Sequence, residues 1–266
     1  MPAFGQGTWH LGENRESREE EIATLRLGIE LGATLIDTAE MYGEGKAEEL
    51  IGVAIERRRD EVFLVSKVYP HNATRRGAIA ACERSLKRLR TDRLDLYLLH
   101  WRGTVPLEET MEAFMALREA GKIRHYGVSN LDLADMQELW DIPGGREVQT
   151  DQVLYNLTRR GIEWGLLPWL RERRIPVMAY SPIEHGRLVN HQGLVRVARR
   201  YGMTPAQIAL AWLLRNDDII VIPKCADRGR LKENLSALPI ALNAEQLAEL
   251  DRLFPPPAGP TPLEMI

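Results

Sequence analysis

The sequence predicts a (β/α)8 TIM barrel that fills a single domain over residues 1–266. Eight short aliphatic or β-branched runs recur along the chain, and amphipathic segments with a period of about 3.6 residues lie between most of them. No linker, low-complexity tract or fixed-period repeat divides the sequence. Strands that alternate with helices form a parallel sheet, and eight of them in one domain close more readily into a barrel than into an open sheet.

The expected strands share a short run of mostly apolar residues. They are Pro2–Thr8, Thr34–Thr38, Val62–Ser66, Leu94–Leu99, Ile123–Ser129, Val148–Val153, Ile175–Tyr180 and Ile219–Pro223. Nearly continuous apolar runs are typical of strands that are covered on both faces.

Capping residues and apolar stripes predict the helices. Ser17 and Glu20 are spaced as a capping box, and Thr204 with Gln207 repeats the pattern around Pro205 at the first helical position. The stripes at helical spacing are Ile22/Leu25/Ile29, Ile79/Cys82/Leu86/Leu89, Leu107/Met111/Phe114, Ile208–Leu214 and Leu247/Leu250/Leu253. Residues 255–266 hold five prolines and cannot continue a regular element.

Charge and hydropathy exclude several classes of partner. The 35 Lys and Arg against 38 Asp and Glu give a net charge of −3, and the charges are interspersed, so nucleic acid is not an expected partner. No run approaches the roughly 18 apolar residues of a membrane span, and the first residues lack the features of a secretory signal. We therefore expect a cytoplasmic protein, either a monomer or a weak homo-oligomer.

The cysteines and most of the histidines carry no metal signal. Cys82 and Cys225 are the two cysteines of the chain, and neither stands in a metal-ligand spacing. The same is true of His10, His71, His125, His185 and His191. The sequence therefore predicts no metal site and no disulfide framework.

The chain also lacks the fingerprint of an open dinucleotide-binding sheet. Gly5-Gln6-Gly7 is followed by Thr8-Trp9-His10, without the third glycine. In a barrel the working face lies at the carboxyl ends of the strands. Polar residues stand at five of these ends: Asp37, Lys67, His100, Ser129-Asn130 and Gln152.

One segment strongly resembles the signature of the aldo-keto reductase family: Gly32–Gly43, followed by Glu48–Gly52. Further landmarks of the family follow in order, namely Val65–Val68, Leu98–Trp101, Gly127–Asn130, Asp151–Asn156, Ala179–Pro182 and Ile222–Lys224. The resemblance extends from about residue 2 to residue 254. Gly5–Trp9, Tyr69-Pro70 and Glu264–Ile266 are most similar to bacterial methylglyoxal reductase-type members.

The resemblance implies four catalytic residues: Asp37, Tyr42, Lys67 and His100. Carbonyl reduction needs a proton donor, and a phenol with a pKa near 10 is a poor acid at neutral pH. A lysine ammonium close to Tyr42 would lower that pKa, and a carboxylate would hold the ammonium charged. His100 would donate to the substrate oxygen. Each residue singly also fits a structural role, such as helix capping or packing, and the ordered set is what favours catalysis.

The resemblance also implies residues for an NADPH cofactor. Ser129, Asn130 and Gln152 would hold the nicotinamide carboxamide, and Tyr180 would stack on its ring. Lys224 and Arg230 would bind a 2′-phosphate, while Glu233 and Asn234 would face the adenine. Thr8, Trp9, Asp37, Ser181 and Cys225 complete the expected cofactor groove, and Trp9, Tyr69 and Trp101 would line an apolar substrate pocket. The tail 255–266 would lie over or near that pocket.

The function that we expect is NADPH-dependent reduction of small aldehydes and methylglyoxal-like 2-oxoaldehydes, with Tyr42 as proton donor. One alternative is an NADPH-binding regulatory subunit that resembles the β subunits of potassium channels and has little turnover. A second is an aldolase-like barrel in which Lys67 forms a Schiff base. A small carbonyl compound is the expected partner in the first and third cases.

Overall fold

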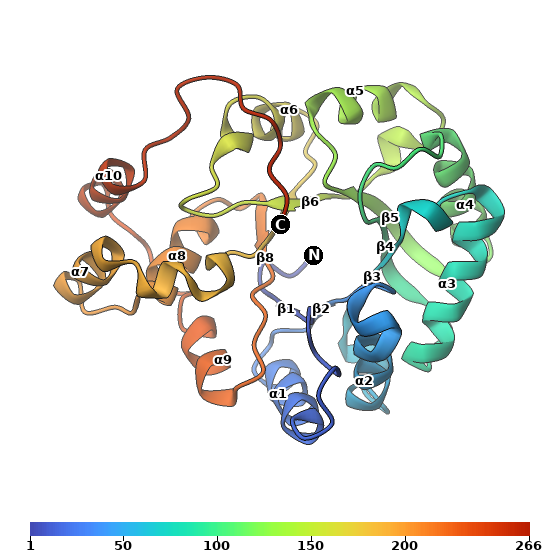
Figure 1. Cartoon of the computed structure of the whole chain (residues 1–266), viewed down its shortest axis with the longest axis horizontal. Helices are drawn as coiled ribbons and strands as arrows, with labels where there is room; N and C mark the ends of the chain where they lie inside the picture. The colour runs from blue at the N-terminus through green and yellow to red at the C-terminus, as the bar shows by residue number, and fades with distance from the viewer.

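The computed structural model describes all 266 residues and confirms the predicted barrel. Eight parallel strands follow one another around the sheet in chain order. Two further parallel bridges, Phe4 with Val221 and Gly7 with Lys224, join the last strand to the first. Figure 1 shows the resulting ring of strands with the helices around its outside.

Every predicted strand run overlaps a strand of the barrel, although two of the strands continue beyond the expected ends at Ser66 and Val153. The strands are β1 (Gly5–Gly7), β2 (Leu35–Asp37), β3 (Phe63–Val68), β4 (Leu94–Leu99), β5 (Ile123–Ser129), β6 (Asp151–Leu154), β7 (Val177–Tyr180) and β8 (Ile219–Val221). The largest differences are at β1 and β6, which begin at Gly5 and Asp151 rather than at Pro2 and Val148. The 3-10 turn Gly145–Glu147 occupies the chain shortly before β6.

The helices form the outer layer. They are α1 (Arg18–Glu30), α2 (Lys46–Ala54), α3 (Arg75–Leu89), α4 (Leu107–Glu119), α5 (Leu133–Asp141), α6 (Leu166–Glu172), α7 (Gln192–Arg200), α8 (Pro205–Leu214), α9 (Arg228–Leu235) and α10 (Ala244–Leu253). Short 3-10 turns occur at Tyr42–Gly45, Arg59–Glu61, Pro70–Asn72, Gly145–Glu147, Gly161–Glu163, Glu184–Gly186 and Leu188–Asn190. None of the helices combines the length and the apolar character that a membrane span requires.

The core has two parts because side chains alternate along each strand. One buried cluster lies among Leu35, Val65, Leu96, Leu98, Met178, Ile220 and Ile222. A larger cluster of 59 buried residues packs the strands against the helices. Since side chains two positions apart point to the same face, Asp37 and Lys67 continue the face that Leu35 and Val65 begin. Strand periodicity therefore places Asp37 and Lys67 next to the inner cluster, toward the carboxyl ends of the strands.

The two predicted capping boxes have different outcomes. At α8, the Gln207 amide donates to the Thr204 hydroxyl (3.2 Å) and the Gln207 side chain accepts from the Thr204 amide (2.7 Å), so this box is confirmed. The box at Ser17 is wrong, because the Ser17 backbone is already helical and its hydroxyl donates to Glu21 (2.8 Å). Glu20 instead forms an ion pair with Arg228. Ser17 and Glu20 thus each have another side-chain partner in place of the expected cap.

The tail, residues 255–266, forms no helix or strand, as its prolines predict. It leaves α10, passes α6 and ends over the middle of the ring, where the red chain end is marked in Figure 1. Leu263 is half-buried and packs against the larger core cluster. The tail therefore contacts the body of the barrel through few side chains.

Candidate active site

Three neighbouring strands bring the four expected catalytic side chains together. Asp37 ends β2, Lys67 lies near the end of β3, and His100 directly follows β4. Tyr42 lies in the 3-10 turn that follows β2. Because neighbouring parallel strands end at the same rim of a barrel, residues that are far apart in sequence become neighbours here.

Lys67 is the centre of the arrangement. Its ammonium donates to the Asp37 carboxylate (2.9 Å), the Thr38 carbonyl (2.9 Å) and the Tyr42 phenol oxygen (3.1 Å). Lys67 is fully buried and Asp37 is nearly so. A buried charge is tolerated when it is paired and hydrogen-bonded, and three oxygens around one ammonium meet that requirement.

The electrostatic balance at Tyr42 differs from the expected one. Burial raises the pKa of Tyr42 above the ordinary phenol value, and the charge of Lys67 offsets only part of that rise. Burial alone would lower the pKa of Lys67, but the charges of Asp37 and Tyr42 outweigh it, so this pKa is raised. The expected lowering of the phenol pKa by Lys67 is present, but burial outweighs it, so the net shift is upward. Tyr42 is protonated and Lys67 is charged at neutral pH.

His100 is a neutral imidazole. Burial, with a further contribution from the charge of Lys67, lowers its pKa to about 2. Its ring meets the Tyr42 ring edge-on, with 5.8 Å between centroids. Nδ1 is buried and has no hydrogen-bond partner. Nε2 is not buried in this way, so it is the ring nitrogen that a bound group can reach.

The residues expected around a nicotinamide form a second hydrogen-bonded group next to the first. Gln152 donates to the other oxygen of Asp37 (2.7 Å), and Ser129 donates to the Gln152 carbonyl (2.8 Å). Asn130 donates to the His100 carbonyl (3.1 Å) and accepts from the Tyr180 hydroxyl (3.0 Å). The structure therefore joins these four residues to the catalytic set.

The loops after β1 and β7 meet at the edge of the same face. Thr8 donates to the Asp37 carbonyl (2.8 Å), which fixes the end of β1 against β2. The Trp9 ring contacts the rings of His10 and His185 at 4.1 and 4.8 Å between centroids. Ser181 follows β7 with a left-handed backbone. These residues border the expected cofactor groove.

The residues expected at the adenosine end lie after β8. Lys224 and Arg230 are exposed, and neither side chain forms an ion pair. Asp227 caps α9 by accepting from the Arg230 amide (2.8 Å), and the Cys225 thiol donates to the Asp227 carbonyl (3.0 Å). Burial raises the pKa of that thiol. In α9, Asn234 is buried and Glu233 is half-buried. Two unpaired cations close to a helix start fit a phosphate group.

The expected substrate residues separate into two places. The rings of Tyr69 and Trp101 meet edge-on at 5.9 Å between centroids, and His100 lies 4.8 Å from Trp101. Trp9 makes its ring contacts with His10 and His185 instead. Tyr69 and Trp101 therefore form one aromatic wall beside His100. No group of three or more His, Cys, Asp or Glu side chains is arranged as metal ligands.

Comparison with known proteins gives the family of the chain. A model of the aldo/keto reductase family matches residues 3–254. The chain belongs to the aldo/keto reductase family. The methylglyoxal reductase YeaE of Escherichia coli K12 is 51% identical over 273 residues, which cover 100% of this chain and 95% of that protein. The glyoxal reductase of Bacillus subtilis 168 is 31% identical over 272 residues, with coverage of 100% and 94%.

A solved structure is similar over the whole barrel. It is the crystal structure of an aldo/keto reductase from Klebsiella pneumoniae in complex with NADP and acetate, with a TM-score of 0.98 and 50% identity. The match covers 100% of this chain and 96% of that chain. The resemblance to this reductase family that the sequence motifs indicate is thus confirmed.

Sequence reasoning missed one residue of this aldo/keto reductase that shapes the site. Glu40 is buried, and one of its carboxylate oxygens accepts from the Tyr69 amide (2.8 Å) and from the Asn72 side chain (3.0 Å). It therefore holds the loop that carries Tyr69 of the aromatic wall. Glu40 stands within the signature segment Gly32–Gly43, but its partners lie about thirty residues further on, which no local pattern reveals.

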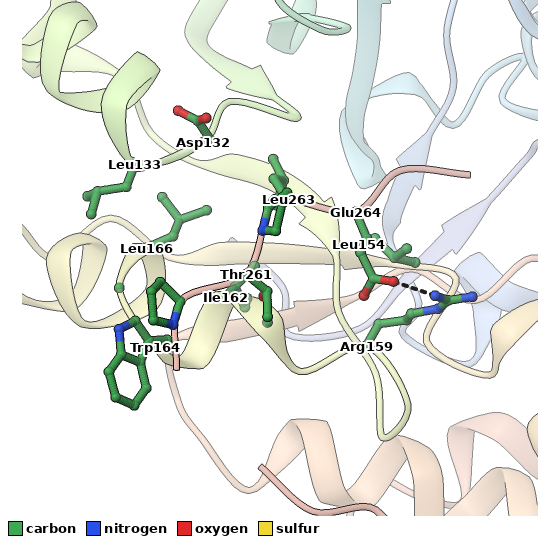
Figure 2. A pocket seen from close by; sticks show the side chains of 14 residues that line it. Asp132, Leu133, Leu154, Arg159, Ile162, Trp164, Leu166, Thr261, Leu263 and Glu264 are labelled. Carbon is green, nitrogen blue, oxygen red and sulfur yellow. Dashed lines mark hydrogen bonds and ion pairs between the residues drawn. The ribbon is translucent and has the colours of Figure 1, made fainter. Parts of the chain in front are cut away.

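A pocket of about 130 Å³ lies beside the catalytic group rather than within it. Figure 2 shows its lining, in which Glu264 of the tail is turned to Arg159, while Leu133, Leu166 and Trp164 lie on the other side of Leu263. Leu154, which also lines the pocket, ends β6, two residues after Gln152. The pocket thus lies between the rim of the barrel and the tail. The sequence did not predict the contact between Arg159 and Glu264 that holds the tail at this pocket.

Proposed function

We propose that this chain catalyses the NADPH-dependent reduction of small aldehydes and 2-oxoaldehydes such as methylglyoxal. The observation that carries the proposal is the buried hydrogen-bonded series Asp37–Lys67–Tyr42 at the barrel rim, with neutral His100 beside it. The named activity of the methylglyoxal and glyoxal reductases that the chain resembles supports the substrate class. The NADP bound in the similar Klebsiella structure supports the cofactor.

In this proposal the residues divide the work of proton transfer. The reduced nicotinamide supplies the hydride when it is bound. Tyr42 holds the proton for the developing alkoxide, since burial keeps the phenol protonated. As that proton leaves, the Lys67 ammonium at 3.1 Å stabilises the phenolate, and Asp37 holds the ammonium in place. Nε2 of neutral His100 donates to the substrate oxygen and orients the carbonyl.

The residues present fit an NADPH molecule. Asn130, Ser129 and Gln152 offer amide and hydroxyl groups next to the catalytic four. At the other end of the groove, the exposed cations Lys224 and Arg230 have no acidic partner in the protein. A 2′-phosphate is the group that would pair with them, which favours NADPH over NADH.

The substrate size follows from the aromatic wall and the tail. Tyr69 and Trp101 present apolar surfaces beside His100, and Leu263 lies across the nearby pocket. A wall of rings next to two hydrogen-bond donors suits a short carbonyl compound. We infer that methylglyoxal and similar aldehydes are accepted and that the tail contributes to the substrate pocket.

The test is turnover by the purified chain, followed at the absorbance band of NADPH, with methylglyoxal, glyoxal and a series of longer aldehydes. We expect consumption of NADPH with the short 2-oxoaldehydes and slower consumption with NADH. Tight NADPH binding with no turnover of any aldehyde would contradict the proposal and favour the regulatory-subunit alternative.

Borohydride treatment with carbonyl substrates separates the aldolase alternative. A Schiff base needs a neutral amine, whereas the pKa of Lys67 is raised by Asp37 and Tyr42 despite its burial. We expect no borohydride-trapped adduct. An adduct whose mass maps to Lys67 would overturn the assigned role of this lysine.

A further inference from the structure

Arg159 lies at the end of a rigid turn that follows β6. The Asn156 side-chain oxygen accepts from the amides of Thr158 (2.9 Å) and Arg159 (3.1 Å). The backbones of Asn156 and Arg159 also pair with each other. Because these bonds hold the turn closed, the Arg159 side chain starts from a defined position.

The Arg159 guanidinium binds two carboxylates from separate segments. Its Nε and Nη2 donate to Glu184 at 3.1 and 2.9 Å, while Nη1 donates to Glu264 of the tail. Figure 2 shows the contact between Arg159 and Glu264. Since different nitrogens serve the two carboxylates, both contacts exist at once. Arg159 therefore connects the tail with the segment that follows β7.

That segment, Ser181–Gly186, is strained and depends on its contacts; we name it the β7 loop. Ser181, Glu184 and His185 all have left-handed backbones, with φ of 47°, 49° and 52°. Such conformations persist in non-glycine residues when the surroundings hold them. Asn156 donates to the Ser181 carbonyl (2.9 Å) and to Glu184 (2.7 Å), beside the Arg159 contacts. The Asn156–Arg159 turn thus supports the loop.

The tail has few other anchors at the barrel rim. Leu263 is half-buried, whereas Glu264, Met265 and Ile266 are exposed. The Ile266 backbone amide opposes the rise that burial causes in the pKa of Tyr180, so the chain end lies close to that phenol. A tail held by so few groups is sensitive to the loss of one ion pair.

We propose that Arg159 is a positioning residue that couples the tail to the β7 loop, so that ordering one segment orders the other. The inference rests on the proposed function, in which NADPH lies against the β7 loop and the carbonyl substrate enters beside the tail. Cofactor binding then also completes the substrate pocket. By linkage, a tail that is held in place strengthens cofactor binding by the same factor.

Hydrogen–deuterium exchange of the cofactor-free protein tests the coupling without any activity. In Glu264→Gln, we expect exchange to rise in residues 255–266 and also in the β7 loop, residues 181–186, by about two- to fivefold, the range of a partly exposed ion pair. Arg159→Met should raise exchange in both segments by more than Glu264→Gln does. Arg159→Lys should raise it by less than Arg159→Met, because the lysine ammonium can keep one of the two carboxylate contacts.

The matched control is Glu147→Gln, which removes an ion pair of similar exposure with Arg118 elsewhere in the fold. It should change exchange in neither segment. If Glu264→Gln raises exchange in the tail alone, the two segments are independent and the proposal is overturned.

A second measurement adds NADPH. In the unmodified protein we expect NADPH to protect both segments, whereas in Arg159→Met it should protect the β7 loop and not the tail. Glu264→Gln should raise the KM for methylglyoxal about two- to fivefold with kcat little changed. Protection of both segments in Arg159→Met would overturn the coupling. Failure of NADPH to bind the unmodified protein would instead contradict the proposed function.

Discussion

Tyr42 is the residue on which the proposed chemistry depends most directly. Its phenol oxygen lies 3.1 Å from the Lys67 ammonium, and it is the group that we propose as the proton donor to the alkoxide. We expect Tyr42→Phe to lower kcat for methylglyoxal by about 10²- to 10⁴-fold, because a positioned acid is lost. The dissociation constant of NADPH should change little, since the hydroxyl does not hold the cofactor.

Lys67→Met is the companion change, and it should lower kcat by a similar factor because it removes the charge that stabilises the phenolate. Steady-state rates and cofactor titration of both variants check the prediction. Loss of a positioned acid should lower the rate by far more than about tenfold. If Tyr42→Phe retained more than about a tenth of the rate, another residue would have to be the proton donor.

Asp151 is a buried carboxylate outside the proposed chemistry. Burial raises its pKa well above the usual range, and the Leu131 backbone amide opposes only part of that rise. Because the folded protein binds this proton more tightly than the unfolded chain, whose carboxyl pKa is about 4, the free energy of unfolding falls as the pH rises above that value.

We therefore expect Asp151→Asn, which cannot ionise, to raise the free energy of unfolding by about 1–3 kcal/mol at pH 8 and by less at pH 5. Urea unfolding at both pH values measures this difference. Asp141→Asn is the control: this aspartate is exposed, so the same change should have little effect at either pH. A larger gain for Asp151→Asn at pH 5 than at pH 8 would contradict the assigned ionisation.

At the scale of elements, the junction between β8 and α9 is proposed to select the cofactor. Lys224 lies within the connection between β8 and α9, and Arg230 lies in the first turn of α9, so both can converge on one phosphate. Hydrogen bonds to charged groups contribute about 1.5–3 kcal/mol each, so Arg230→Ala should weaken NADPH binding by roughly ten- to a hundredfold. NADH lacks the phosphate and should bind nearly as before.

Cofactor dissociation constants from quenching of protein fluorescence, at fixed low salt, check this prediction for both cofactors. Arg228→Ala is the matched control, because Arg228 lies two residues away and is already paired with Glu20. Equal losses for NADPH and NADH in Arg230→Ala would place this arginine outside the phosphate site.

At the scale of the whole molecule, the barrel and the tail should contribute very differently to stability. All eight strands belong to one sheet, so we expect a single cooperative unfolding transition of the chain. Deletion of residues 258–266 removes the half-buried Leu263, the partly exposed Glu264 contact and the exposed tail residues that line the rim pocket. It should lower the free energy of unfolding by no more than about 2 kcal/mol, or a few degrees in Tm.

The same deletion should raise the KM for methylglyoxal, because the tail lines the pocket at the rim. Calorimetry and steady-state kinetics of the truncated protein make the comparison. A large fall in Tm, or two separate transitions in the full chain, would mean that the tail or another part of the chain forms a stability unit of its own.

The sequence by itself determined the order of the elements and the types of residue at the strand ends. Aliphatic runs such as Leu94–Leu99 and stripes such as Leu247/Leu250/Leu253 are local signals, because strand and helix periodicity depend on residues close in the chain. The ordered motifs around Asp37, Lys67 and His100 likewise indicated the family that the match over residues 3–254 confirms.

The tertiary structure decided what depends on distance and burial. Whether Ser17 caps a helix, whether the pKa of Tyr42 rises or falls, and which groups Glu40 holds were settled only by neighbours from distant segments. The connection of Glu184 and Glu264 by Arg159 joins positions 25 and 105 residues away from it. No periodic pattern encodes such contacts, since closure of the barrel brings those side chains together and excludes water from around them.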